Sequence, residues 1–112
     1  MIKEIAIMNS EAELSLSEKA LEIGNVGKAR VCSRRACYFV ISFWLRKNPQ
    51  YNFGNNAMNM LNGVSFEKSF PEEIRNSAER LTKKVNENFD TGFKENPIDD
   101  ARIIINYFLE KS

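Results

Sequence analysis

The sequence predicts an all-α fold, an antiparallel bundle of four main helices plus one short helix. Three observations support this. Apolar residues recur every three or four positions, helix-start and helix-stop residues separate the periodic segments, and no alternating strand-and-hairpin pattern occurs. The 112 residues, 43% hydrophobic and 28% charged, have the length and composition of a single folded domain covering residues 1–112.

The segment 25–47 is the predicted centre of the bundle. Asn25 is a good helix-start residue, and no Pro or Gly interrupts the segment after Gly27. Residues 36–45 are the most apolar ten of the chain. The helix should end before Pro49, because the residue preceding a proline is pushed out of the helical region. A helix that is cationic at one end and apolar nearly all round at the other is typical of a central bundle helix.

A first helix is predicted over residues 11–23. Ser10 followed by Glu13 matches the capping-box pattern of a helix start. The apolar face predicted to meet the core consists of Ala12, Leu16, Ala20 and Ile23, widened by Leu14 and Leu21. Gly24 should end the helix as a left-handed cap. Residues 1–9 are expected to be a short arm or an early helical turn.

The fourth predicted helix starts with a second capping box, Ser69 with Glu72, and has Pro71 in its first turn. Its apolar stripe comprises Ile74, Ala78, Leu81 and Val85, extended by Phe89, and its solvent side comprises Arg75, Glu79, Lys83 and Lys84. The turn-forming residues 90–92 should break it.

A short helix and a last helix complete the bundle. The short one is predicted over residues 57–61, closed by Gly63. The last one starts with Asn96 as the cap and Pro97 at the first helical position. Its predicted core residues are Ile98, Ala101, Ile104, Ile105 and Phe108.

The composition limits the catalytic and metal-binding groups that the chain can offer. The chain has no histidine, which removes the commonest general base and metal ligand, and we expect neither a metal nor a cofactor. Cys32 and Cys37 are five residues apart, so they point in different directions on a helix and cannot bridge each other. We therefore expect reduced, buried thiols in a cytoplasmic protein. The N-terminus lacks a signal-peptide pattern, and residues 36–45 are too few to span a bilayer, so no membrane association is expected.

Charge is distributed unevenly along the chain. No acidic residue occurs between Glu22 and Glu67, and this window has a local charge of +6, although the whole chain has only +1. Its cations are Lys28, Arg30, Arg34, Arg35, Arg46 and Lys47. They either form a surface that attracts nucleic-acid phosphates or nucleotides, or pair with acids of the first and fourth helices.

Four residues form the candidate anion site: Lys28, Arg30, Arg34 and Arg35. Arg30 and Arg34 are one helical turn apart and could grip one anion from two sides. Gly27 and Lys28 stand at a predicted helix start, where free main-chain N–H groups favour anions. The pattern of a phosphate-binding loop is incomplete, because such a loop needs glycines at a fixed spacing and a preceding strand.

Three aromatic residues of the central helix allow two interpretations. Phe39, Phe43 and Trp44 lie in an apolar run, which favours a place in the core. Apolar surface left over around them would instead form the face of a homodimer.

Catalytic residue sets are hard to find in this sequence. Asp99 and Asp100 are adjacent acids, but neighbouring helix positions diverge by about 100° and acids in a first turn are ordinary capping residues. No catalytic residue is therefore assigned, although an enzyme with carboxylate or thiol chemistry stays open.

The helix order and three stretches resemble HEPN-type domains of bacteria and archaea. The stretches are GKARVCSRRA on the second helix, PEEIRNSAERLT on the fourth and DDARIIINYFLE on the last. The resemblance covers most of the chain. It implies a helical bundle, often dimeric, of a family that includes RNases, nucleotide-binding proteins and accessory partners of toxin–antitoxin nucleotidyltransferases.

The nuclease chemistry of that family is not matched. Its RNase members carry an Arg, a polar residue, and a His that is separated from the Arg by four to six intervening residues. Arg75 and Asn76 match the opening, but Arg80, Leu81 and Thr82 stand where the His would fall. The resemblance therefore implies a non-catalytic binding or partner module.

The sequence thus favours a non-enzymatic association module, most simply a homodimer that could also hold a protein partner. A protein that binds nucleic acid or nucleotide phosphates through the basic second helix is the alternative.

Overall fold

Five α-helices make up the part of the chain that the structure describes. The computed structural model describes residues 2–83 and 96–111. The helices are α1 (Lys3–Glu22), α2 (Val26–Lys47), α3 (Ala57–Phe66), α4 (Glu72–Thr82) and α5 (Pro97–Glu110). Within these ranges the protein is all helix and loop, with no strand, which confirms the predicted all-α class.

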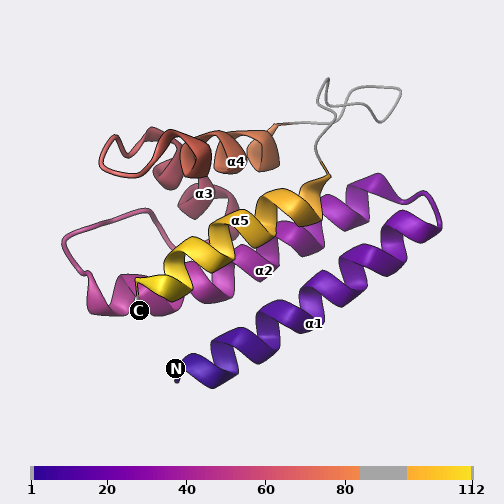
Figure 1. Cartoon of the computed structure of the whole chain (residues 1–112), viewed down its shortest axis with the longest axis horizontal. Helices are drawn as coiled ribbons and strands as arrows, with labels where there is room; N and C mark the ends of the chain where they lie inside the picture. Colours follow the sequence, from indigo (N-terminus) through magenta and orange to yellow (C-terminus); the bar gives the residue numbers. More distant parts are fainter. Residues whose placement is uncertain (1, 84–95, 112) are drawn as a thin grey trace.

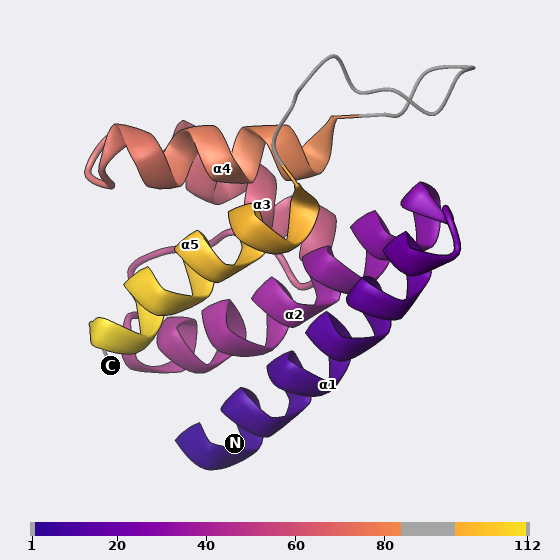
Figure 2. The same cartoon turned by 45° about the vertical axis from the view of Figure 1, so that its right-hand side comes forward.

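Helix α2 lies at the centre and contacts each of the other four helices. Helix α1 runs antiparallel to α2 along one side, and α3 and α4 lie together on the other side (Figures 1 and 2). Helix α5 runs along α2, between α1 and the α3–α4 pair. In the described ranges, α1 packs against α2 and α5 alone. One flank of α1 therefore faces solvent over the whole helix.

The core gathers around α2 and α5. Trp44 packs edge-on against Phe108 and Phe70, with ring centroids 5.1 and 5.8 Å apart. Aliphatic side chains that are completely buried fill the rest: Leu14, Val40, Ile41, Leu61, Val64, Leu81 and Ile104. The predicted core residues of the last helix are all buried, as are the first three residues of the predicted α4 stripe.

The predicted ends of α2 and the start of α5 are confirmed. The Asn25 side chain accepts a hydrogen bond from the Lys28 N–H at 3.0 Å, and Asn96 does the same for Ile98 at 2.7 Å. Gly24 between α1 and α2 has a φ of 76°, the left-handed conformation that favours glycine. Polar caps and glycine act locally, which is why the sequence reports them well.

The predicted start of the first helix is wrong, and its predicted face is right only for Leu14, Ala20 and the half-buried Leu21. Helix α1 begins at Lys3, and Ser10 is a buried mid-helix residue whose hydroxyl donates to the Ile7 carbonyl at 2.9 Å. Its buried residues are Ala6, Ser10, Leu14, Ser17 and Ala20, whereas Ala12, Leu16 and Ile23 are exposed. Four of the five buried side chains are small, so the α1 backbone can approach α2 closely.

Buried serine hydroxyl groups find hydrogen-bond partners in the contact between α1 and α2. Ser17 Oγ donates to the Ala29 carbonyl at 2.7 Å and lies 2.8 Å from Ser33 Oγ, all buried. A pattern based on polarity alone assigns serine to the surface, so it does not place Ser10 and Ser17 on the buried face.

Two further boundaries need correction. Helix α3 runs through Gly63 to Phe66, so Gly63 does not close it. The glycine serves packing instead, because a Cβ at position 63 would collide with the Phe53 ring. Helix α4 has Pro71 at its cap position without a side-chain cap, so the capping box of Ser69 is wrong. The helix ends at Thr82. The predicted core residues Val85 and Phe89, the solvent-side Lys84 and the predicted break at 90–92 lie outside the described residues.

Candidate functional site

Two arginines of α2 hold the carboxyl end of α4. Arg30 Nη2 donates to three main-chain carbonyl oxygens, those of Arg80 at 2.7 Å, Leu81 at 3.1 Å and Lys83 at 2.5 Å. Arg34 Nη1 donates to the Leu81 carbonyl at 3.0 Å. The last carbonyls of a helix have no partner within it and carry its negative end charge, so a guanidinium suits them. We call Arg30 and Arg34 the arginine clamp.

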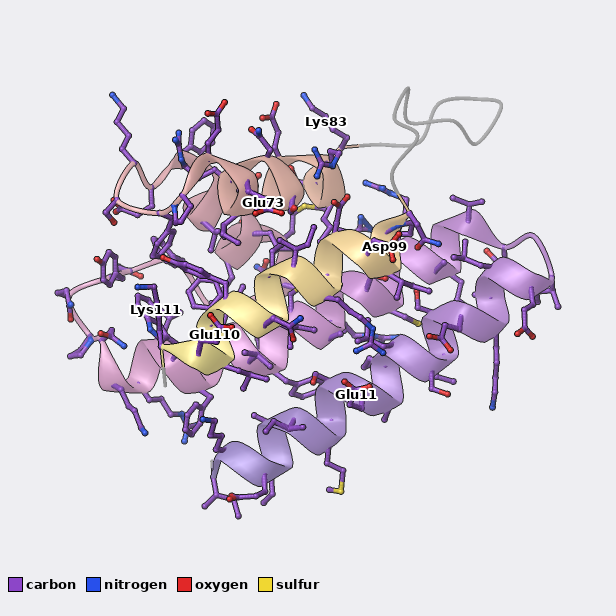
Figure 3. All side chains as sticks on the ribbon, viewed as in Figure 1. Glu11, Glu73, Lys83, Asp99, Glu110 and Lys111 are labelled. Carbon is purple, nitrogen blue, oxygen red and sulfur yellow. The ribbon has the colours of Figure 1, made fainter. Side chains whose placement is uncertain are left out.

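A buried ion pair joins the same end of α4 to the start of α5. Arg80 Nη2 lies 2.8 Å from Asp100 Oδ1, and Arg80 Nε lies 3.1 Å from both carboxylate oxygens. Asp100 is only 2% exposed, whereas its neighbour Asp99 is at the surface (Figure 3). The two adjacent acids therefore do different things, and they do not form a pair that shares a proton.

The environment of the clamp works against its charge. Burial lowers the pKa of Arg30, the neighbouring Arg34 lowers it further, and Asp100 acts in the opposite direction. Burial alone lowers the pKa of Arg34. Arg30 Nε is buried without a hydrogen-bond partner among the described residues. These cations are held by the fold at some energetic cost, which is the mark of a structural role.

The four residues predicted as an anion site are divided between two environments. Arg30 and Arg34 point their donors into α4, whereas Lys28 and Arg35 stay at the surface. Arg35 Nε lies 3.4 Å from Glu13 Oε2 of α1, as expected for pairing with an acid of the first helix. The two-pronged grip of Arg30 and Arg34 is thus directed at carbonyl oxygens.

The residues predicted for a dimer face are mostly in the core. Phe43 and Trp44 are each 5% exposed, and Lys47 Nζ covers the Phe43 ring at 4.7 Å. The apolar surface of Phe43 and Trp44 is used inside the protomer, so of the three residues only Phe39 keeps surface that a dimer face could use. Phe39 is half-buried against Tyr38, with ring centroids 5.5 Å apart.

Phe39 borders a shallow pocket between α2 and the start of α3. The pocket has a volume of about 290 Å³ and is lined by Arg35, Tyr38, Phe39, Asn55, Asn56 and Ala57. The Asn56 side chain caps α3 by accepting from the Asn59 N–H at 2.8 Å. Two of the polar residues that line the pocket, Asn56 and Arg35, thus have partners in the protein.

Among residues 2–83 and 96–111, the largest group of exposed apolar side chains lies on α1. Four large side chains are exposed there, Ile5 by 41%, Met8 by 63%, Leu16 by 42% and Ile23, directly after the helix, by 78%. With Ala12, also exposed, they fall within an arc of about 80° at 100° per residue, on the side turned away from α2. We call these five residues the α1 stripe.

One edge of the α1 stripe is acidic. Glu4, Glu11, Glu18 and Glu22 follow it on the side facing α5. Glu11 is held there by Arg102 of α5, through contacts of 3.1 and 3.3 Å, and its position beside α5 is visible in Figure 3. The sequence pattern finds this stripe but assigns most of it to the core. The missed signal is the second face, made of small residues at positions 6, 10 and 17 beside Ala20, which the pattern does assign to the core.

The two cysteines offer no reactive thiol. Both are free and buried, and Cys37 Sγ lies 3.9 Å from the Ala101 carbonyl. Burial raises the pKa of Cys37 far above its ordinary value, so this thiol stays protonated. The described part of the chain contains no group of acids and cysteines arranged to hold a metal ion. Nor does any helix in residues 2–83 and 96–111 combine the length and apolarity needed to cross a membrane.

Comparison with known proteins adds no relative to this picture. No protein-family model matches the chain, and neither a curated protein nor a solved structure is significantly similar to it.

Proposed function

We propose that this protein is a non-enzymatic association module that acts as a homodimer through the α1 stripe. The observation that carries the proposal is the exposure of four large apolar side chains in one row on an edge helix. Contiguous exposed apolar surface is a common mark of interaction sites on proteins. A second helix lying along the row would remove it from water, with roughly 25 cal/mol gained per Å² buried.

A second copy of the chain is the occupant that the surface favours. The α1 stripe carries Lys19 within it and glutamates along one edge, so the same surface presents both signs of charge. A surface with both signs can complement itself, whereas a surface of one sign requires a partner of the other.

The buried charges support a role without catalysis. The clamp arginines, Arg80 and Asp100 are the most unusual polar groups of the described chain, and each of them binds another part of the protein. Their chemistry is used to hold α4 and α5 in place.

Sedimentation velocity tests the proposal. We expect the wild-type protein to shift from monomer to dimer between roughly 1 and 100 µM, the range of a modest helix-pair interface. Leu16→Glu places a charge in the row and should give a monomer throughout. Phe66→Glu is the matched control, since Phe66 is 82% exposed on α3, away from α1, and this variant should still dimerise. A monomeric wild type at 100 µM would refute the proposal.

A HEPN-like, non-catalytic identity is part of this proposal. The three stretches that resemble the family contact each other, since Arg30 reaches the Arg80 carbonyl and Arg80 binds Asp100. The two buried free cysteines are consistent with a reducing cytoplasm. Single-stranded RNA should stay intact with the purified protein, and metal-independent cleavage of that RNA would contradict the assignment.

Phosphate binding is the weaker candidate. It would depend on Lys28 and Arg35, because the donors of the other two predicted cations are directed at α4. Nucleic acid that copurifies with the protein and is released by high salt would support phosphate binding.

A further inference from the structure

The α1 stripe has a symmetric spacing. Ile5 and Ile23 lie nine residues on either side of position 14, and Ala12 and Leu16 lie two residues on either side of it. When two copies of a helix pair antiparallel about a two-fold axis, residues equally far from the axis on opposite sides face each other. An axis at the height of Leu14 would therefore match both pairs at once.

Side-chain sizes fit this register. Ile5 would face Ile23 of the partner subunit at each end of the interface. Near the axis, Leu16 would lie over the partner subunit's Ala12, so that a large side chain enters the space left by a small one. Between them, Met8 would lie along the aliphatic stem of Lys19 of the partner subunit.

Charge distinguishes the antiparallel pair from the parallel one. In the antiparallel register, the two copies of Lys19 lie ten residues apart along the axis, about 15 Å at 1.5 Å per residue. The acidic edges of the two helices lie on the same side of the pair, where Arg102 binds Glu11 of each copy close to the height of the partner subunit's Glu18. In a parallel register, Lys19 would face Lys19 of the partner subunit at the same height. The helix dipoles also oppose each other only in the antiparallel pair. The separation of the two lysines and the opposed helix dipoles favour the antiparallel arrangement.

We propose that the dimer is an antiparallel α1–α1 pair with its two-fold axis at the height of Leu14, so that Ile5 of each copy meets Ile23 of the other. This inference rests on the homodimer proposed above and specifies its geometry. The stripe then serves as one isologous interface in which each copy contributes the same residues, and the assembly closes at two subunits.

Cysteine cross-linking tests the register. Ile5→Cys and Ile23→Cys proteins are prepared separately, mixed and oxidised mildly. In the proposed register two copies of position 5 are about 27 Å apart along the axis, at 1.5 Å per residue, far beyond disulfide reach. The native Cys32 and Cys37 are fully buried and should not compete. Phe66→Cys measures the background of random encounters.

We expect the mixture to give roughly tenfold more cross-linked dimer than either variant alone, because the register brings position 5 to position 23. Strong cross-linking of Ile5→Cys by itself would show a parallel pair and overturn the inference. Yields at the Phe66→Cys background, with a wild type that still sediments as a dimer, would place the interface elsewhere and also overturn it. A wild type that sediments as a monomer would refute the homodimer itself.

Discussion

Asp100 shows at the scale of one residue how a local pattern can hide a long-range role. Two adjacent acids at the start of α5 look like ordinary capping residues. One of them, Asp100, is instead buried against Arg80 of α4, 2.8 Å away. The sequence predicts the position of both acids on the helix. It does not predict that one faces the interior, because that depends on which other helix packs against the first turn.

Asp100→Asn should therefore lower the free energy of unfolding by about 3 kcal/mol, because it removes the charge of a buried carboxylate that accepts hydrogen bonds from Arg80. Asp99→Asn is the matched control, since it removes the same charge from the same first turn at an exposed position, and it should cost less than about 1 kcal/mol. Urea titration of both variants measures the difference. Equal losses would show that the buried ion pair adds nothing beyond the helix dipole.

Cys37 gives stability a pH dependence. Burial raises the pKa of the folded thiol above its ordinary value of 9.0, so the folded protein keeps this proton while the unfolded chain releases it above that pH. The folded state then binds more protons than the unfolded state. Stability should fall as pH rises above 9.0, by up to about 1.4 kcal/mol per pH unit from this group.

Urea midpoints at several alkaline pH values test this, with Cys37→Ala as the reference. The variant should be less stable at neutral pH but should lose stability less steeply at alkaline pH. Parallel curves for the two proteins would contradict the assigned pKa shift.

The arginines separate what the sequence can and cannot report about single residues. Pairing of the basic helix with acids of the first helix is one of the two alternatives that the sequence leaves open, and Arg35 lies 3.4 Å from Glu13 of that helix. The partners of Arg30 are main-chain carbonyls fifty residues away. Every residue has a main-chain carbonyl, and the sequence does not show which of them will lie near Arg30, so the clamp could not be predicted.

At the scale of an element, glycines in helices have opposite roles in α2 and α3. At Gly27 the nearest atom to an added Cβ would be 3.9 Å away, whereas at Gly63 the added Cβ would collide with Phe53. Gly27→Ala should raise the free energy of unfolding by about 0.5 kcal/mol, since it reduces the freedom of the unfolded chain. Gly63→Ala should lower it by about 1–3 kcal/mol through overpacking. Thermal unfolding of the pair checks both signs, and stabilisation by Gly63→Ala would mean that Phe53 moves aside freely.

Helix α1 marks the limit of periodicity as a guide to packing. The sequence has an apolar face of large residues and a second face of alanine and serine, and hydrophobicity alone selects the first. The structure buries the second, because small residues allow close approach and the serine hydroxyls find partners at Ala29 and Ser33. Boundaries controlled by local chemistry, such as Asn25 and Asn96, were predictable.

At the scale of the whole molecule, the fold class and the central place of α2 followed from the sequence, whereas the free surface did not. That surface should make stability depend on protein concentration, because a dimer is favoured by mass action. The melting temperature of the wild type should rise with each tenfold increase in concentration, and that of Leu16→Glu should stay constant. Differential scanning calorimetry measures both. A wild-type melting temperature that is independent of concentration would leave no role for the dimer in stability.

The arginine clamp also has a consequence for the order in which the chain folds. Helices α1 and α2 are joined by three residues and can pair early, whereas Arg30 must wait for a segment fifty positions along the chain. The clamp should therefore close after the main folding barrier, and its loss should appear as faster unfolding with a nearly unchanged folding rate. Stopped-flow kinetics of Arg30→Met would show this as a shift of the unfolding limb alone. A slower folding limb would instead place the clamp inside the folding nucleus. If the unfolding limb alone shifts, the contacts of Arg30 form late and determine how long the native state lasts once it has formed.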